Sequence, residues 1–269
     1  MIDILNYSFM QRAMIAGTLI GALCAVVGVY VILRGMAFMG SGIAHSSLGG
    51  VAIGILFGVN PIWSAVVFSV LAGWGIAAAS RKGHVKEDTA IGIMFVSGMA
   101  LGILIIGLTH SYQVDLLSYL FGSITAVTVQ DVWTTVVITV LVLGCVFVLY
   151  KDLMFVIFDP EMAEVTGMPA GKLYYLLITM IALTVVMSIK VVGIVLVSAL
   201  IVTPAAAAYQ LTESFKKMMA LAVVFGIGST IGGLLISDWL AIAPGASIVL
   251  LATLAFVVSA AFSPRRRRK

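Results

Sequence analysis

Long stretches of the sequence carry no charged residue, and their lengths indicate the fold. The uncharged runs are 13–33, 35–80, 89–114, 116–130, 132–150, 173–189, 191–212, 218–237 and 239–264. An apolar helix of about 20 residues crosses the roughly 30 Å of hydrocarbon in a bilayer. Most of the runs can hold such a helix, so the pattern predicts an all-α fold, a bundle of transmembrane helices.

Two of the runs do not fit a single span. The run 35–80 is too long, and Asn60-Pro61 is expected to break it into segments near 43–58 and 62–80. The run 116–130 is short and polar, which favours a re-entrant or surface helix shielded by protein. The sequence therefore predicts eight or nine spans plus one short or re-entrant helix.

Composition agrees with the bilayer as the solvent for most of the chain. Of the 269 residues, 62% are hydrophobic and 10% are charged, and the mean hydropathy is +1.21. These values exclude a soluble enzyme and a disordered tail. Cys24 and Cys145 both lie in long apolar runs, which excludes a disulfide scaffold. We expect residues 1–269 to form one transmembrane domain.

The basic residues predict the orientation of the spans. Twelve of the 15 Lys and Arg residues fall in four segments on one side of the membrane if the spans alternate. They are Arg81, Lys82 and Lys86, then Lys151 and Lys172, then Lys216 and Lys217, and finally residues 265–269. Basic loops stay in the cytoplasm, so we predict a multi-pass protein of the plasma or inner membrane with a cytoplasmic C-terminus. The basic tail, 264–269, abuts an apolar segment and is interpreted as a cytoplasmic stop, with no nucleic-acid partner expected.

One polar site lies within the apolar part of the chain. Ser41 and His45 are four residues apart and would share one face of a helix. A histidine at this depth is costly unless it faces a partner helix or a wet path, and imidazole commonly binds divalent transition metals. Packing against a neighbouring helix is the ordinary role of such a residue, and ligation of a metal is the alternative. Met39 could add a thioether sulfur, although core filling is the usual role of methionine.

His110 and Asp115 lie at the predicted outer boundary. They could line a vestibule where an ion enters the protein, and an ordinary hydrated loop is the favoured interpretation.

A short polar segment, 158–170, interrupts the apolar pattern on the cytoplasmic side. Asp159 can cap a helix, Pro160 suits its first turn, and Gly167 can end it. Such a helix is either a docking element for a partner or an ordinary capped loop helix. The chain lacks a phosphate-binding loop of the Gly-x-x-x-x-Gly-Lys-Ser/Thr type, because Gly171-Lys172 is followed by Leu173. Any ATP must therefore bind to another subunit, and we expect a transport subunit with no enzyme activity of its own.

Several motifs together point to a known family. They are VILRGMAFMG at 31–40 with His45 and Gly50, LFGS at 120–123, FDPE at 158–161, and LVSAL at 196–200 followed by Thr203-Pro204. In this order they resemble the membrane permease subunit of ATP-binding-cassette importers for zinc, manganese or iron. The resemblance covers nearly the whole chain.

The resemblance implies partners and a path for the ion. It implies a second permease protomer, with a homodimer favoured, two cytoplasmic ATP-binding subunits docked on 158–170, and an extracytoplasmic metal-binding protein. The ATPase-coupling residues would be Asp159, Pro160, Glu161, Glu164 and Gly167. The transported divalent ion is the substrate, ATP stays on the partner subunit, and no covalent cofactor is expected.

The resemblance also implies a metal site at His45. Family members commonly carry an aspartate four residues before this histidine, where Ser41 stands here. Loss of a carboxylate removes an oxygen ligand suited to Mn²⁺, whereas imidazole suits Zn²⁺. Zinc is therefore the favoured substrate, with manganese or iron as alternatives.

Three other functions remain as alternatives. A permease for a metal chelate such as a siderophore or corrinoid would share the architecture but need a wider polar cavity. An ion-coupled secondary transporter usually carries charged residues in mid-span, and every Asp and Glu here lies at a loop or boundary. An intramembrane hydrolase using Ser41, Ser46 or Ser47 with His45 is disfavoured, because neighbours in sequence do not form a converging nucleophile and base.

Overall fold

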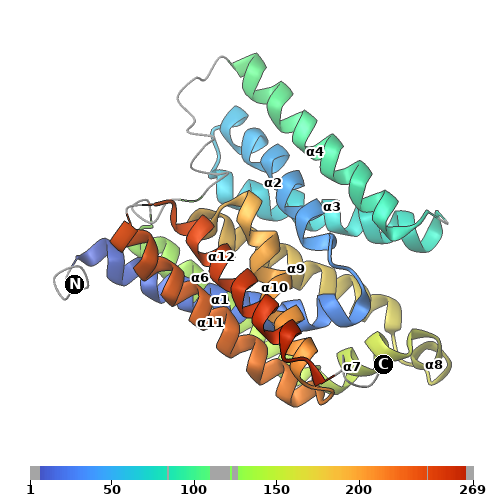
Figure 1. Cartoon of the computed structure of the whole chain (residues 1–269). Coiled ribbons are helices and arrows are strands. Elements are labelled where there is room, and N and C mark those ends of the chain that lie inside the picture. The colour runs from blue at the N-terminus through green and yellow to red at the C-terminus, as the bar shows by residue number, and fades with distance from the viewer. Residues whose placement is uncertain (1–6, 84, 110–121, 123–126, 241, 265–269) are drawn as a thin grey trace.

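The computed structural model of the chain describes residues 7–83, 85–109, 122, 127–240 and 242–264, and these consist of helices joined by short turns and loops (Figure 1). The helices are α1 (Ser8–Arg34), α2 (Met39–Leu56), α3 (Pro61–Lys82), α4 (Glu87–Thr109), α6 (Val129–Val148), α7 (Tyr150–Phe158), α8 (Pro160–Val165), α9 (Ala170–Val192), α10 (Ile194–Leu211), α11 (Phe215–Leu240) and α12 (Pro244–Ala261). The predicted all-α bundle is confirmed.

Eight helices in the described part of the chain are long and apolar enough to cross a membrane. They are α1, α2, α3, α4, α6, α9, α11 and α12. Whether there is a ninth span depends on α10, whose apolar part, Leu196–Leu211, is shorter. The prediction of eight or nine spans agrees with this set. The short helix expected within 116–130 lies almost wholly outside the described residues, and α6 begins at Val129.

Local chemistry explains why the longest uncharged run is divided. The Asn60 side chain accepts a hydrogen bond from the backbone N–H of Ile62 at 3.0 Å and caps α3, and Pro61 occupies its first turn. Gly58, with φ of 67°, ends the turn that follows α2. The predicted break at Asn60-Pro61 is therefore confirmed, and α2 begins four residues earlier than expected, at Met39.

Glycines let the helices approach closely where no hydrophobic driving force acts between them. A Cβ atom on Gly98 of α4 would lie 2.6 Å from the Cα of Ser46 on α2. On the other side of the molecule, a Cβ on Gly21 of α1 would lie 2.7 Å from the carbonyl oxygen of Gly226 on α11. These two contacts fix the spacing of α2 against α4 and of α1 against α11.

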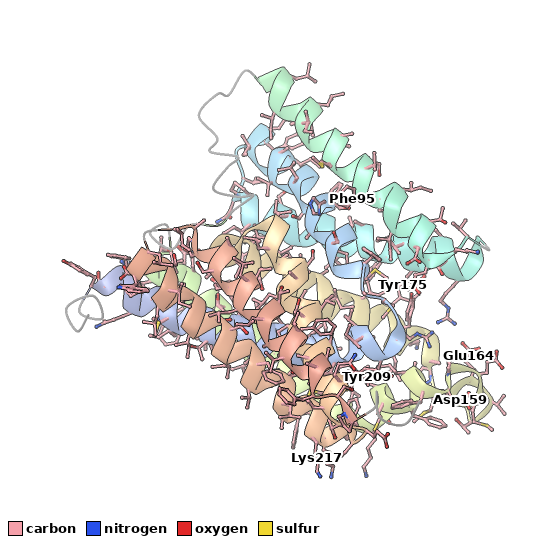
Figure 2. The ribbon with its side chains drawn as sticks, viewed as in Figure 1. Phe95, Asp159, Glu164, Tyr175, Tyr209 and Lys217 are labelled. Carbon is pink, nitrogen blue, oxygen red and sulfur yellow. The ribbon has the colours of Figure 1, made fainter. Side chains whose placement is uncertain are left out.

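Charged side chains lie together at one end of the bundle. In Figure 1, α7 and α8 lie at the end where α1 finishes, and the start of α1 lies at the opposite end. One cavity at the end with α8 is lined by Arg34, Arg81, Glu87 and Glu164. The ends of α1 and α3 and the start of α4 therefore meet α8. Lys217 and Asp159 are labelled at the same end in Figure 2. Charged side chains therefore gather around α8.

Candidate functional site

His45 lies on the side of α2 that packs against α4. Its ring is half-buried and packs against Phe95 of α4, with ring centroids 4.3 Å apart and planes tilted by 37°. Figure 2 shows Phe95 on the side of α4 that faces α2. Sequence reasoning missed Phe95, since one aromatic residue in an apolar run carries no local signal.

The hydrogen bond of His45 leaves one ring nitrogen available. Nδ1 lies 3.0 Å from the backbone carbonyl oxygen of Ser41, which can only accept a hydrogen bond. Nδ1 must therefore carry a hydrogen to make this bond, and in the tautomer that does so the lone pair lies on Nε2. An imidazole that donates from one nitrogen to a carbonyl can offer its other nitrogen to a metal ion.

The other predicted ligands differ in their placement. Ser41 is half-buried and shares a face of α2 with His45. Its contact with the imidazole described above is made by its backbone carbonyl oxygen. Met39 is completely buried within the core, as is Met36 at 1% exposure. Core filling therefore describes Met39 better than ligation does. His110 and Asp115 lie outside the described residues.

The described part of one copy offers too few ligands for a metal ion. Within the described residues, no group of three or more His, Cys, Asp or Glu side chains could hold an ion together. Structural metal sites in proteins use about four such donors. His45 therefore needs ligands from elsewhere, or holds an ion only weakly.

Two serines next to His45 bind the backbone. Ser46 Oγ lies 2.7 Å from the carbonyl oxygen of Gly42 and 2.8 Å from that of Met94, so it joins α2 to α4. Ser47 Oγ donates to the carbonyl oxygen of Ala44. Among the described hydrogen bonds of these side chains, none joins a serine hydroxyl to the imidazole of His45. A serine hydrolase site has no geometric support here.

The capped segment forms as expected, with a shorter helix. The Asp159 side chain accepts a hydrogen bond from the backbone N–H of Met162 at 2.9 Å, and Pro160 begins α8. The helix ends at Val165, and Gly167 follows with a left-handed φ of 82°. Only 160–165 of the predicted 158–170 are helical in α8, because α7 runs to Phe158 and α9 starts at Ala170.

The surface of α8 suits a protein partner. Met162 and Val165 are 50% and 82% exposed, and Phe158 just before the helix is 64% exposed. Glu161 and Glu164 are exposed beside these apolar side chains. Exposed apolar groups rimmed by charges are typical of interaction sites.

An ion pair ties α8 to the transmembrane helices. Arg81 Nη2, at the end of α3, lies 2.8 Å from Glu164 Oε1. The sequence indicated Arg81 only as one of several basic loop residues. The partners are 83 positions apart in the sequence, which explains why the pair carries no local signal.

A second cavity lies at the end opposite α8. Its volume is about 210 Å³, and Asn60, Thr128 and Asp131 are among the residues that line it. The Asp131 carboxylate accepts hydrogen bonds from the backbone N–H and the hydroxyl of Thr128, at 2.8 and 2.6 Å. Thr128 and Asp131 therefore form a capping box at the start of α6.

Comparison with known proteins gives matches over nearly the whole chain. The model of the ABC 3 transport family matches residues 6–263. The manganese transport system membrane protein MntC of Halalkalibacterium halodurans is 41% identical over 264 residues, which cover 98% of this chain and 90% of that protein. MntC of Listeria monocytogenes is 41% identical over 263 residues, covering 98% of this chain and 94% of the relative.

The fold has a close counterpart among solved structures. PsaBC from Streptococcus pneumoniae, in complex with a Fab, superposes with a TM-score of 0.90 at 37% identity. The match covers 99% of this chain and 96% of that one. The resemblance read from the motifs and the expected type of bundle are both confirmed.

Proposed function

The chain belongs to the ABC 3 transport family, and we propose from this premise that it is the membrane permease of an ATP-driven importer of manganese ions. The observation that carries the proposal is the 41% identity, over 98% of the chain, to membrane proteins named for manganese transport. The preference for zinc that Ser41 and His45 suggest finds no specific support in these relatives.

The ion path that we propose runs past His45 between two copies of the chain. Nε2 of His45 is the available ligand, and one copy lacks a full ligand set among its described residues. Paired imidazoles from two copies would hold an ion briefly. Weak binding favours transport, because an ion that is held too tightly does not leave.

Energy for transport would come from a separate ATP-binding subunit docked on α8. The exposed apolar side chains of Met162 and Val165 and the neighbouring acidic residues support this role. The basic residues near α8 favour a cytoplasmic position for this end and for the C-terminus. A metal-binding protein would then deliver the ion at the opposite end of the bundle.

Zinc is the second candidate substrate, and one observation favours it. Ser41 supplies no carboxylate beside His45. Mn²⁺ prefers oxygen ligands and Zn²⁺ accepts imidazole readily. The proposal of manganese therefore needs further oxygen donors from the partner copy, from the backbone or from water.

Uptake by the reconstituted transporter tests the proposal. The permease, its ATP-binding subunit and its metal-binding protein are placed in proteoliposomes, and radioactive Mn²⁺, Zn²⁺ and Fe²⁺ are offered separately. We expect Mn²⁺ to accumulate only when ATP and both partners are present. Accumulation of Zn²⁺ alone would favour the second candidate. Accumulation only of metal chelates, or accumulation without the ATP-binding subunit, would contradict the proposed function.

A further inference from the structure

Five side chains from five helices meet beside α8. They are Arg34 of α1, Arg81 of α3, Glu87 of α4, Glu164 of α8 and Tyr174 of α9, and all line one cavity of about 170 Å³. We call this group the α8 cluster. It lies where the proposed ATPase dock meets the transmembrane helices. Figure 2 shows Glu164 and Tyr175, the neighbour of Tyr174, at this end of the bundle.

Tyr174 is the centre of the α8 cluster. The guanidinium carbons of Arg34 and Arg81 lie 5.8 and 5.9 Å from the centroid of its ring, within the range of cation–π attraction. Its hydroxyl donates a hydrogen bond to the carboxylate of Glu87. Tyr174 itself is 6% exposed. One buried side chain therefore contacts the end of α1, the end of α3 and the start of α4.

Arg81 links Tyr174 to α8. Its guanidinium binds Glu164 at 2.8 Å and also lies against the Tyr174 ring. A Cβ atom on Gly171 would lie 3.3 Å from Arg81 Nη1, so the absence of a side chain at 171 leaves room for the guanidinium. Arg81 and Glu164 are 39% and 56% exposed, and an ion pair at that exposure adds little to stability. The ion pair matters here because it connects Arg81 to α8, and not because of the stability that it adds.

Two residues of the α8 cluster, Glu87 and Arg34, lie on or close in sequence to the helices that form the candidate metal site, α4 and α2. Glu87 is the first residue of α4, and Phe95 lies eight residues further on, about 12 Å along the helix. Arg34 is the last residue of α1, and only the turn at Gly35 and three further residues separate it from α2. His45 and Phe95 are in contact with each other. The helix that carries His45, α2, therefore begins five residues after Arg34, and α4, which packs against it, begins at Glu87 of the α8 cluster.

We propose that Arg81, Tyr174 and Glu87 are positioning residues that convert movement of α8 into movement of α2 and α4 around His45. The inference rests on the proposed function. A displaced α8 pulls Arg81 through Glu164, and Arg81 and Tyr174 pass the displacement to Glu87 and Arg34. Loss of these contacts leaves the ATPase able to hydrolyse ATP but separates hydrolysis from transport.

The test measures Mn²⁺ uptake and ATP hydrolysis together in proteoliposomes holding the complete transporter. Arg81→Glu should lower the number of ions moved per ATP about five-fold or more, the lower range of typical coupling between sites. The swap Arg81→Glu with Glu164→Arg restores the ion pair but not the contact of Arg81 with the Tyr174 ring, so it should recover part of that ratio. Lys86→Glu is the matched control, because it reverses an exposed charge in the same connection between α3 and α4.

Two further variants keep the test independent of charge reversal. Gly171→Val leaves every charge in place and displaces the Arg81 guanidinium, and Tyr174→Phe removes only the hydroxyl that binds Glu87. Both should lower the ratio of ions to ATP while the complex still assembles on size-exclusion chromatography. A wild-type ratio in assembled Arg81→Glu and Tyr174→Phe complexes, or no recovery in an assembled swap, would overturn the inference. A wild-type transporter that moves no metal would instead contradict the proposed function.

Discussion

Replacing Gly98 by alanine is expected to separate α4 from α2 and to impair transport. The added Cβ would lie 2.6 Å from the Cα of Ser46 and 3.1 Å from its Oγ. An ordinary carbon–carbon contact needs about 3.5–4.0 Å, so α4 must move away by about 1 Å. The same movement lengthens the bond from Ser46 Oγ to the Met94 carbonyl, now 2.8 Å, beyond hydrogen-bonding range.

The expected cost can be worked out from these contacts. Overpacking of this size costs about 1–3 kcal/mol, and a lost hydrogen bond between membrane helices costs about 0.6–1.7 kcal/mol. Alanine favours a helix over glycine by about 1 kcal/mol, which offsets part of the loss. We expect a net destabilisation of about 1–3 kcal/mol, together with displacement of Phe95 from His45.

A matched control lies on the same helix. Gly92 of α4 is exposed, and a Cβ there would meet nothing within 4 Å. Thermal unfolding in detergent and ATP-driven Mn²⁺ uptake are measured for Gly98→Ala and Gly92→Ala side by side. Gly92→Ala should keep or raise the unfolding temperature and retain uptake. Equal unfolding temperatures and equal uptake for the two variants would refute the account of α2–α4 packing.

Three further changes have defined outcomes. Asp159→Ala removes the cap of α8, which should cost about 0.5–2 kcal/mol of local helix stability and weaken binding of the ATP-binding subunit, measured by co-purification. Ser41→Asp adds a carboxylate beside His45 and should raise the uptake of Mn²⁺ relative to Zn²⁺; an unchanged ratio would place the choice of ion elsewhere. Gly226→Ala puts a Cβ 2.9 Å from that of Ala25 on α1 and should lower the unfolding temperature, whereas exposed Gly228→Ala should keep or raise it.

Local chemistry explains which parts of the fold the sequence predicts well. Uncharged runs predict the spans because the bilayer selects for length and hydropathy alone. Asn60-Pro61 and Asp159-Pro160 place helix starts, since a cap and a proline act on the next few backbone groups. Such signals depend on neighbours in sequence, so they can be read without a structure.

Contacts between distant segments could not be predicted in this way. Arg81 and Glu164 are 83 residues apart, and Arg81 resembles any other basic loop residue in the sequence. Phe95 meets His45 only because Gly98 lets α4 approach α2 closely. The place of Met39 next to Ser41 in the sequence suggests a ligand, whereas its side chain is fully buried in the core.

The substrate was the least predictable feature. A single position, Ser41, favoured zinc, whereas relatives over the whole chain are named for manganese. The serine at position 41 shows only that one copy of the chain lacks a carboxylate at this position. Ligands supplied by a second copy, by the backbone or by water leave no pattern near His45 in the sequence.

The most direct test of the account is metal uptake by His45→Ala in the reconstituted transporter. Ser47→Ala is its control, because the Ser47 hydroxyl binds the backbone of α2 itself. We expect His45→Ala to abolish ATP-driven Mn²⁺ uptake while the permease still assembles with its ATP-binding subunit, and Ser47→Ala to retain uptake. Wild-type uptake by an assembled His45→Ala transporter would contradict the claim that the ion passes through a site formed by this histidine.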